Sequence, residues 1–191
     1  MSKGFDYIWF KKVLSKKEIK KINTYIDKHF DFYEDASQHA ARDLQNRIIK
    51  NAKVKCIYWN KIYPFIRTPM DQAFNSITHN FGYDIHTPTS VNVANLNIYS
   101  SKDKGNYGWH IDCTNAGDLY DLKGTILLNI SMKPYEGGQF KIFNQEEYHV
   151  DQYDEPGSMI IVRSFLNHKV EPVTKGERRS LAFLASGPKF K

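Results

Sequence analysis

Residues 108–113 read Gly-Trp-His-Ile-Asp-Cys, so that one residue separates His110 from Asp112. If this stretch is a strand or the end of one, both side chains point to the same face, because side chains alternate along a strand. His168 lies far downstream, after a strand-length apolar run that a Pro-Gly pair introduces. Two imidazoles and one carboxylate form the facial triad, which holds a non-heme ferrous ion and leaves other coordination positions open. These three residues are therefore candidate ligands of one metal ion.

A basic side chain and a hydroxyl follow the second histidine. Arg178 lies ten positions after His168 and opens a strand-like run in which Ser180 is the third residue. A guanidinium inside a barrel needs an anion, and a carboxylate is its best geometric match. Period two places the Ser180 hydroxyl on the same face as Arg178. Arg179 then faces the opposite way, and we expect it to be exposed to solvent.

These residues together resemble the Fe(II)/2-oxoglutarate-dependent dioxygenases, and most closely the prolyl 4-hydroxylase and PKHD-type hydroxylases. The likeness covers roughly residues 93–186. A His-x-Asp motif alone would be a weak signal, but four blocks in the family's order are a strong one. The blocks are Tyr99, 106–112, 135–140 and 167–178.

The resemblance implies a mainly β, α+β fold: a double-stranded β-helix of the jelly-roll or cupin kind, with supporting helices at the N-terminal side. It implies Fe(II) held by His110, Asp112 and His168, and 2-oxoglutarate that chelates the iron while its far carboxylate meets Arg178 and Ser180. Dioxygen is the other cosubstrate, and ascorbate is expected as an accessory reductant. Catalysis then requires no side chain beyond the metal centre.

Two further side chains are candidates for binding the cosubstrate. Tyr99 matches a family position that often contacts 2-oxoglutarate, and Asn97 shares its strand face by period two. Many prolyl hydroxylases carry Arg-Tyr where this chain has Asn97-Ile98-Tyr99. An Asn-x-Tyr pair ahead of His-x-Asp also resembles the AlkB-like nucleic-acid demethylases, although their second, arginine-rich signature is not matched. This departure does not affect the prediction that the chain binds Fe(II) and 2-oxoglutarate. The prediction of the substrate becomes less specific.

The implied activity is hydroxylation of an unactivated C–H bond, with succinate and CO2 as coproducts. We expect the substrate to be a prolyl residue of a peptide or protein, and Tyr107, Trp109 and Tyr135 are aromatic residues that could line a groove for an extended chain. Oxidation of nucleic acid or of a free small molecule by the same iron chemistry is the alternative. A third hypothesis is a catalytically inactive barrel that only binds its ligand. The intact triad and Arg178 disfavour this hypothesis.

Other assignments of the metal site were weighed against this one. Zinc or nickel could occupy the same ligands, because the ligand types alone do not enforce iron. His149 is a rival third ligand, but it lacks an arginine ten positions further on, so a surface or core role is preferred. Gly137 and Gly138 indicate a turn or bulge rather than a phosphate-binding loop.

Length and composition bound the remaining possibilities. The chain has 191 residues, which suits a single domain, with 1–90 as N-terminal support and 91–187 as the catalytic core. Hydrophobic residues make up 41% of the chain, but no run reaches the roughly 20 apolar residues of a membrane span. The N-terminus lacks a hydrophobic signal segment, so we expect a cytoplasmic location and no membrane partner. Cys56 and Cys113 are too few to indicate a disulfide framework.

The net charge of +6 is concentrated near the N-terminus. A solvated helix face is the ordinary explanation for such a cluster, and binding of nucleic acid or an acidic partner is the alternative. The cluster comprises Lys11, Lys12, Lys16, Lys17, Lys20, Lys21 and Lys28.

The expected elements follow from the hydrophobic pattern. Residues 5–10 predict a strand, and Ser15 with Glu18 forms a capping box that opens a helix. Residues 62–81 keep helical spacing, and two prolines lead us to expect the continuous helix from about Thr68 to Gly82. Residues 31–52 have no sustained period and form either an irregular connection or a loop over the site. The remaining strands are expected at 54–59, 91–99, 108–113, 125–132, 139–143, 147–150, 158–162, 168–173 and 178–185.

Overall fold

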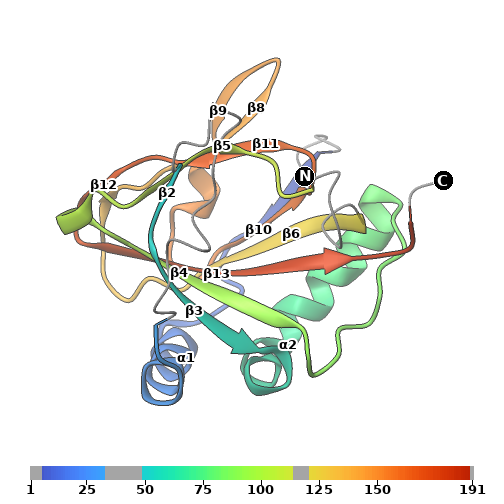
Figure 1. The fold of residues 1–191 in the computed structure, drawn as a ribbon, viewed down its shortest axis with the longest axis horizontal. Coiled ribbons are helices and arrows are strands. Elements are labelled where there is room, and N and C mark those ends of the chain that lie inside the picture. Colours follow the sequence, from blue (N-terminus) through green and yellow to red (C-terminus); the bar gives the residue numbers. More distant parts are fainter. Residues whose placement is uncertain (1–5, 33–48, 114–120, 190–191) are drawn as a thin grey trace.

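Two antiparallel sheets face each other in the computed structural model, which describes residues 6–32, 49–113 and 121–189 (Figure 1). The larger sheet has the strand order β1-β10-β6-β13-β4-β3 and the smaller one β2-β5-β11-β8-β9. This mainly β arrangement is the double-stranded β-helix that the sequence predicted. The larger sheet consists of β1 (Tyr7–Phe10), β3 (Lys53–Tyr58), β4 (Val93–Ser100), β6 (Leu122–Asn129), β10 (Met159–Arg163) and β13 (Glu177–Ser186).

The smaller sheet carries a projecting hairpin, and a short strand pair lies beside it (Figure 1). Its strands are β2 (Lys50–Asn51), β5 (Asn106–His110), β8 (Phe140–Asn144), β9 (Glu146–His149) and β11 (Asn167–Val170). The separate pair is β7 (Glu136–Gly137) with β12 (Val173–Lys175). All the strands expected from Val54 onward have counterparts here, with shifted ends. The expected strand at 168–173 is divided between β11 and β12. The strand β7 was not predicted.

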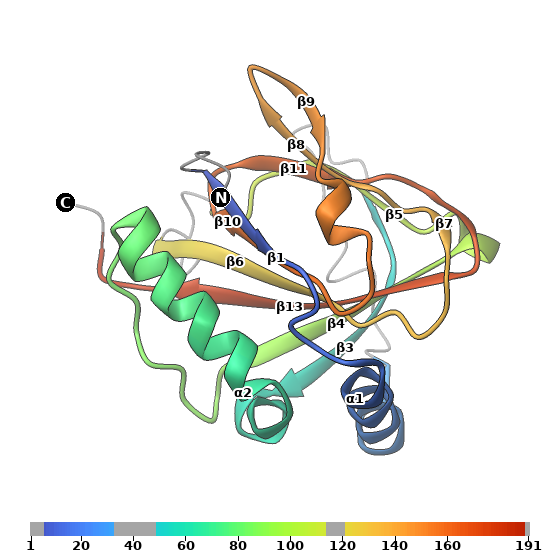
Figure 2. The ribbon, with the colours of Figure 1, turned by 180° about the vertical axis from the view of Figure 1, so that it is seen from behind.

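Helices α1 (Lys16–His29) and α2 (Trp59–Ser76) cover the outer face of the larger sheet (Figure 2). Apolar side chains of both helices pack with outward residues of that sheet, including Leu96, Leu128 and Leu181. A second cluster, which includes Leu127, Phe140 and Ile160, fills the space between the two sheets. The molecule therefore has three layers, and the two sides of the larger sheet serve different cores.

Helix α1 begins as predicted. The Ser15 hydroxyl accepts a hydrogen bond from the Glu18 amide at 3.3 Å, and the Glu18 carboxylate accepts one from the Ser15 amide at 2.7 Å. Ile19, Ile22 and Ile26 are buried, as the helical spacing predicted. The lysines at 16, 17, 20, 21 and 28 are exposed. The basic cluster is therefore, over these residues, the solvated face of α1.

Arg179 corrects the expectation of solvent exposure. It faces away from Arg178 as period two requires, but this direction leads into the helix layer, where only 8% of its surface is exposed. Its guanidinium donates to the Asp27 carboxylate at 2.9 Å and to Glu177 at 2.9 Å, and also to the side chain of Asn23. The outer face of this strand is buried because α1 packs on it.

Helix α2 begins earlier than Thr68. It runs from Trp59 to Ser76 with a break at Ile66, whose φ of −124° and ψ of 17° are not helical. Pro69 explains the break, because proline has no N–H to donate and its ring crowds the carbonyl four residues before it. A π-helical turn, η1 (Ile77–Phe81), follows and ends as expected at Gly82, whose φ is +72°. No helix in the described part of the chain is long and apolar enough to cross a membrane.

Candidate metal centre

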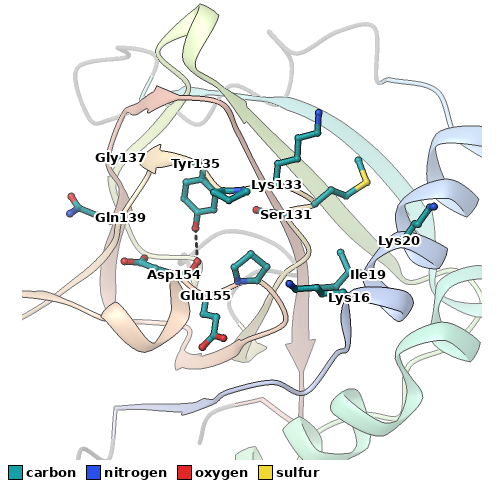
Figure 3. A pocket seen from close by; sticks show the side chains of 13 residues that line it. Lys16, Ile19, Lys20, Ser131, Lys133, Tyr135, Gly137, Gln139, Asp154 and Glu155 are labelled. Atoms are coloured by element: carbon teal, nitrogen blue, oxygen red, sulfur yellow. Dashed lines mark hydrogen bonds between the residues drawn. The ribbon is translucent and has the colours of Figure 1, made fainter.

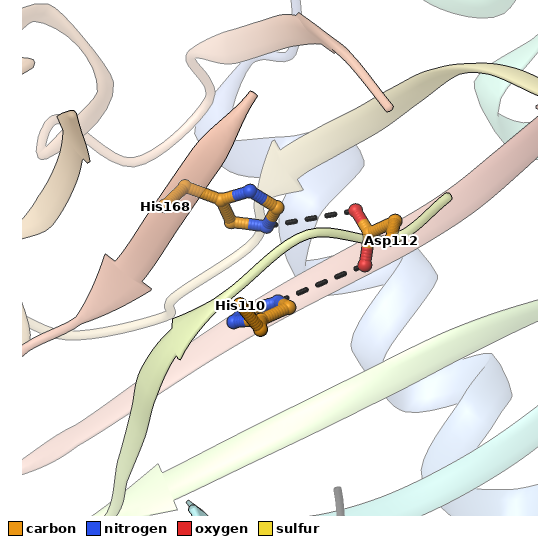
Figure 4. A group of neighbouring side chains, drawn as sticks. All are labelled: His110, Asp112 and His168. Atoms are coloured by element: carbon orange, nitrogen blue, oxygen red, sulfur yellow. Dashed lines mark ion pairs between the residues drawn. The ribbon is translucent and has the colours of Figure 1, made fainter. Parts of the chain in front are cut away.

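The structure brings His110, Asp112 and His168 together, as the sequence predicted (Figure 4). His110 is the last residue of β5 and pairs in register with His168 on β11. Asp112 lies just beyond the strand, where its amide donates to the Ser164 carbonyl at 2.9 Å. The three ligand atoms lie within 4.8 Å of one another. The Asp112 carboxylate oxygens lie 3.7 Å from Nε2 of His110 and 3.5 Å from Nε2 of His168.

Backbone carbonyls hold both imidazole rings. Nδ1–H of His110 donates to the Gly108 carbonyl at 2.8 Å, and Nδ1–H of His168 donates to the Leu166 carbonyl at 2.9 Å. This tautomer leaves the lone pair of each Nε2 aimed at the centre of the cluster. Burial, aided by the neighbouring His168, lowers the pKa of His110, which keeps the ring neutral. Neutral imidazole is the form that coordinates a metal.

A hydroxyl on the larger sheet fixes the carboxylate. Thr125 on β6 donates from Oγ1 to Oδ2 of Asp112 at 2.5 Å. Hydrogen bonds of this kind orient a metal ligand and are nearly as important to affinity as the ligand itself. Thr125 carries no motif that sequence reasoning could have used, since the contact joins β6 of the larger sheet to a residue just beyond β5 of the smaller sheet.

Arg178 occupies the floor of the same cavity without a hydrogen-bond partner. Only 1% of its surface is exposed, and within the described residues none of its three guanidinium nitrogens has a hydrogen-bond partner. The guanidinium carbon lies 5.4 Å from the ring centre of Tyr99 and 5.2 Å from that of Tyr153. Such cation–π contacts leave the N–H donors unused. A buried guanidinium with five free donors calls for an anionic ligand.

Ser180 and Tyr153 lie beside this arginine. Their hydroxyls are 2.7 Å apart, and burial raises the pKa of Tyr153 to about 12, so the phenol stays protonated. Tyr153 was not predicted as a site residue, because it reaches the site from a short 3-10 turn, η4 (Asp151–Tyr153), rather than from a motif. Gly138 passes close to the arginine: a Cβ built on it would lie 3.0 Å from Cδ of Arg178.

The two candidates on β4 both face the cavity. Tyr99 is buried, and burial raises the pKa of its phenol well above the usual range. Asn97 is 6% exposed; its amide nitrogen donates to the Asn95 carbonyl at 3.4 Å, while its Oδ1 has no partner within the described residues. Asn97 therefore holds an unused acceptor, and Tyr99 a protonated hydroxyl, at the edge of the triad.

The cavity between the sheets has a volume of about 150 Å³ and contains every predicted site residue. Lys50, from the segment expected to be irregular, also lines it. A larger cavity of about 770 Å³ lies elsewhere, between the start of α1 and the segments 131–139 and 154–156 (Figure 3). None of the triad residues lines this larger cavity, so the chemistry belongs to the smaller one.

The three aromatic residues expected to form one groove separate in the structure. Tyr107 lines the cavity, with its ring stacked on that of His110 at a centroid distance of 3.5 Å. Trp109 instead packs against Phe143, and Tyr135 lines the larger cavity. The prediction of a shared groove was therefore wrong. His149, the rival ligand, lies away from the triad and contacts Asp154 at 2.6 Å.

A β-bulge explains why Tyr107 and His110 share a face. Strand β11 pairs His168 with His110 and Val170 with Tyr107, so two residues of β5 lie opposite one residue of β11. The extra residue breaks the period-two alternation. Gly108 allows the close approach to the next strand, because a Cβ there would lie 3.2 Å from the Ile49 side chain.

A double-stranded β-helix with two histidines and an aspartate beside a buried arginine defines the class of non-heme iron oxygenases. Residues 94–185 match the family model of the 2OG-Fe(II) oxygenase superfamily. This segment therefore belongs to that superfamily, and the chain is an oxidoreductase of the dioxygenase class. The family implies Fe(II), 2-oxoglutarate and dioxygen, and the donor set present fits this implication. No curated protein matches the chain in sequence.

Solved structures of the same fold include hydroxylases and other oxygenases. A Pseudomonas putida prolyl-4-hydroxylase is 16% identical with a TM-score of 0.68, covering 96% of this chain and 93% of its own. The viral collagen prolyl hydroxylase of Paramecium Bursaria Chlorella virus-1 is 16% identical with a TM-score of 0.67, covering 97% and 98%. SnoK, a carbocyclase from nogalamycin biosynthesis, is 12% identical with a TM-score of 0.66, covering 95% and 80%. At these identities the likeness shows the fold alone.

Proposed function

We propose that His110, Asp112 and His168 bind Fe(II) and that Arg178 binds the far carboxylate of 2-oxoglutarate. The observation that carries this proposal is the buried guanidinium without a partner, which lines the same cavity as the triad. A dicarboxylate that reaches from the metal to Arg178 satisfies both its donors and its charge. The bound metal and cosubstrate supply the activation of dioxygen and the attack on a C–H bond, with succinate and CO2 as coproducts.

Three polar side chains would complete the cosubstrate site. Ser180 and Tyr99 offer hydroxyl donors near Arg178, and the side-chain amide of Asn97, whose nitrogen can donate, lines the same cavity. Their part is to orient the dicarboxylate, while the surrounding apolar residues of the sheet interior exclude water. Ascorbate belongs to the proposal only as an external reductant that returns the iron to the ferrous state.

We infer that the primary substrate is a prolyl residue of a peptide or protein. Tyr107 lines the cavity with its ring stacked on that of His110, and an aromatic side chain at this place suits contact with the pyrrolidine ring of proline. The prolyl hydroxylases with the same fold are consistent with this substrate.

Oxidation of a nucleic acid or a free small molecule is the second candidate. It is favoured by Asn97 and Tyr99, which both line the cavity. The lysines of α1 do not add to it, because α1 packs on the outer face of the larger sheet and the cavity lies on the inner face. The carbocyclase SnoK shows that this fold also occurs in the biosynthesis of a small molecule.

The decisive experiment is an anaerobic visible difference spectrum of the metal-free protein as Fe(II) and then 2-oxoglutarate are added. A metal-to-ligand charge-transfer band that needs both additions, and is missing in Asp112→Ala, supports the cofactor assignment. A folded, metal-loaded protein without the band contradicts it. Incubation with proline-rich peptides, oligonucleotides and free amino acids, followed by a search for a mass gain of one oxygen, then identifies the substrate class.

A further inference from the structure

A second cation lies in the metal cavity. Lys50 on the edge strand β2 pairs with Tyr107 on β5, and its side chain lines the cavity together with the triad. The ammonium lies 5.0 Å from the centre of the Tyr107 ring, which itself stacks on His110. Lys50, Tyr107 and His110 are therefore neighbours along one wall of the cavity, on the smaller sheet. Arg178 belongs to β13 of the larger sheet, so the two cations come from different walls.

No anion is assigned to this ammonium. Among the described residues no carboxylate lies within ion-pair distance of Lys50, and the carboxylate that attracts it, Asp112, belongs to the metal triad. Burial, opposed by that attraction, lowers the pKa of Lys50 to about 8, so the charged form still predominates at pH 7. Lys50 is half-buried, and a charge partly removed from water without a partner is costly, which makes Lys50 a group that a ligand would stabilise.

The charges of the loaded site, as proposed above, leave Lys50 unbalanced. Ferrous iron and Arg178 carry together as much positive charge as Asp112 and the 2-oxoglutarate dianion carry negative charge. Lys50 is then the only charge in the described cavity lining without a counterpart. The cosubstrate has no carboxylate left to offer, because one end chelates the metal and the other meets Arg178. No described residue balances this charge, so we expect the balancing negative charge on the primary substrate.

We propose that Lys50 is a specificity-determining residue that binds a carboxylate or another anionic group of the primary substrate, next to the carbon that is oxidised. This inference rests on the proposed function and narrows its substrate class to compounds with an anionic group, such as proline with a free carboxylate or a prolyl residue next to an acidic one. Tyr107 presents the apolar wall and Lys50 the charge, so the pair recognises a ring with an anion beside it.

The first test uses matched compounds that differ by one charge. L-Proline is compared with L-prolinamide, and a blocked Pro-Glu dipeptide with a blocked Pro-Gln dipeptide, by the succinate that each one elicits. In the wild-type protein the member of each pair that carries the additional carboxylate should have a kcat/KM about tenfold higher, the factor expected for one ion pair of moderate strength. Lys50→Gln should reduce this preference to about twofold or less, through KM, and Lys50→Arg should keep it. Equal use of both members by the wild type, or an unchanged preference in Lys50→Gln, overturns the proposal.

The second test needs no substrate. The anaerobic protein loaded with Fe(II) and 2-oxoglutarate is titrated with methanesulfonate, a weak metal ligand, and with its neutral analogue dimethyl sulfone. A saturable shift of the charge-transfer band with methanesulfonate alone, lost in Lys50→Gln, supports the proposal, because a bound charge beside His110 alters the field at the metal. No shift in the wild type overturns it.

The two tests distinguish a failure of the anion site at Lys50 from a failure of the proposed function. If no proline compound elicits succinate but the methanesulfonate shift depends on Lys50, the prolyl substrate is wrong and the anion site stands. If Lys50→Gln weakens the binding of 2-oxoglutarate itself, Lys50 serves the cosubstrate and the inference is wrong. If the wild type forms no charge-transfer band, the cofactor assignment fails and the inference falls with it.

Discussion

His110 and His168 are direct partners across the antiparallel strands β5 and β11, with ring centroids 4.1 Å apart. A cross-strand pair places both side chains on one face at a separation that the sheet itself fixes. The two nitrogen donors of the metal site are thus positioned by backbone pairing before any metal binds, and Asp112 needs only the turn after β5 to join them.

Asp112→Ala should abolish turnover and remove high-affinity metal binding. Two imidazoles remain in this variant, but the anionic donor that neutralises part of the metal charge is lost. Titration of the metal-free protein with Fe(II) or Co(II) measures the loss. His149→Ala is the matched control, because this histidine contacts Asp154 outside the site. Equal metal affinity in Asp112→Ala and the wild type would remove the aspartate from the ligand set.

Thr125→Val should weaken metal binding by roughly 10- to 100-fold without unfolding the protein. Valine has nearly the shape of threonine but cannot donate to the Asp112 carboxylate, so the carboxylate loses its fixed orientation. The affinity for Co(II), measured by its visible spectrum, reports the effect. Thr125→Ser keeps the donor and should retain most of the affinity; a loss as large as that of valine would indicate a packing effect instead.

Arg178→Ala should raise the KM for 2-oxoglutarate by about a hundredfold, since a charge-assisted contact of this kind contributes 2 kcal/mol or more. A readout independent of turnover is thermal stability. Addition of 2-oxoglutarate to the metal-loaded wild type should raise its Tm, because the ligand binds the folded state, whereas the variant should show little change. Normal saturation by 2-oxoglutarate in the variant would remove Arg178 from its assigned role.

Gly138→Ala should raise the KM for 2-oxoglutarate through the packing of Arg178, not through a polar contact of residue 138 itself. The φ of Gly138 is +63°, and a Cβ there would lie 2.8 Å from Val173 and 3.0 Å from Arg178. The arginine must move to relieve this contact. Gly82→Ala is the control, because Gly82 has a similar φ of +72° but no atom within 4 Å of the added carbon. It should cost about 1 kcal/mol of stability and leave the KM unchanged. The same KM in both variants would contradict the packing argument.

Asp27→Asn should lower the free energy of unfolding by about 1–2 kcal/mol at pH 7, less than for a fully buried pair because Asp27 is partly exposed. Hydrogen bonds from Arg179 and Lys55 lower the pKa of Asp27 below its usual 3.8, although burial works in the opposite direction. A lowered pKa stabilises the fold above the unfolded value and loses this effect as the pH falls through the folded value. Urea unfolding should therefore show a constant difference from about pH 5 to 7 that shrinks below about pH 4. A difference independent of pH would contradict the ion-pair explanation.

The clustering of His110, Asp112 and His168 was predictable because these residues carry local signals. His110 and Asp112 are two positions apart, and His168 follows an apolar strand. The capping box of α1 and the stop at Gly82 are equally local and were also predicted correctly. The partners of these residues were not predictable: Thr125 and Lys50 reach the site through strand pairing between segments far apart in the chain, and Tyr153 reaches it from the turn η4.

Arg179 shows where periodicity stops being informative. Alternation gives the side of the sheet on which a residue lies but not what covers that side. Here α1 covers it, and Asp27 and Asn23 on that helix complete the contact. The bulge at Gly108 could not be predicted for a related reason. One extra residue in β5 reverses the alternation for Tyr107 but leaves no mark in the hydrophobic pattern.

The bulge in β5 also separates two properties of the site, the choice of substrate and the reaction performed. Regular pairing of β5 without the bulge would turn Tyr107 to the other face of the sheet and out of the cavity, because three positions separate it from His110, while the cross-strand pairing of the two histidines could stay as it is. A change in how β5 pairs at this point would thus alter which molecules are accepted while the oxidation chemistry stays the same. A change of backbone pairing in β5 can therefore alter the range of substrates while the metal-binding residues stay the same.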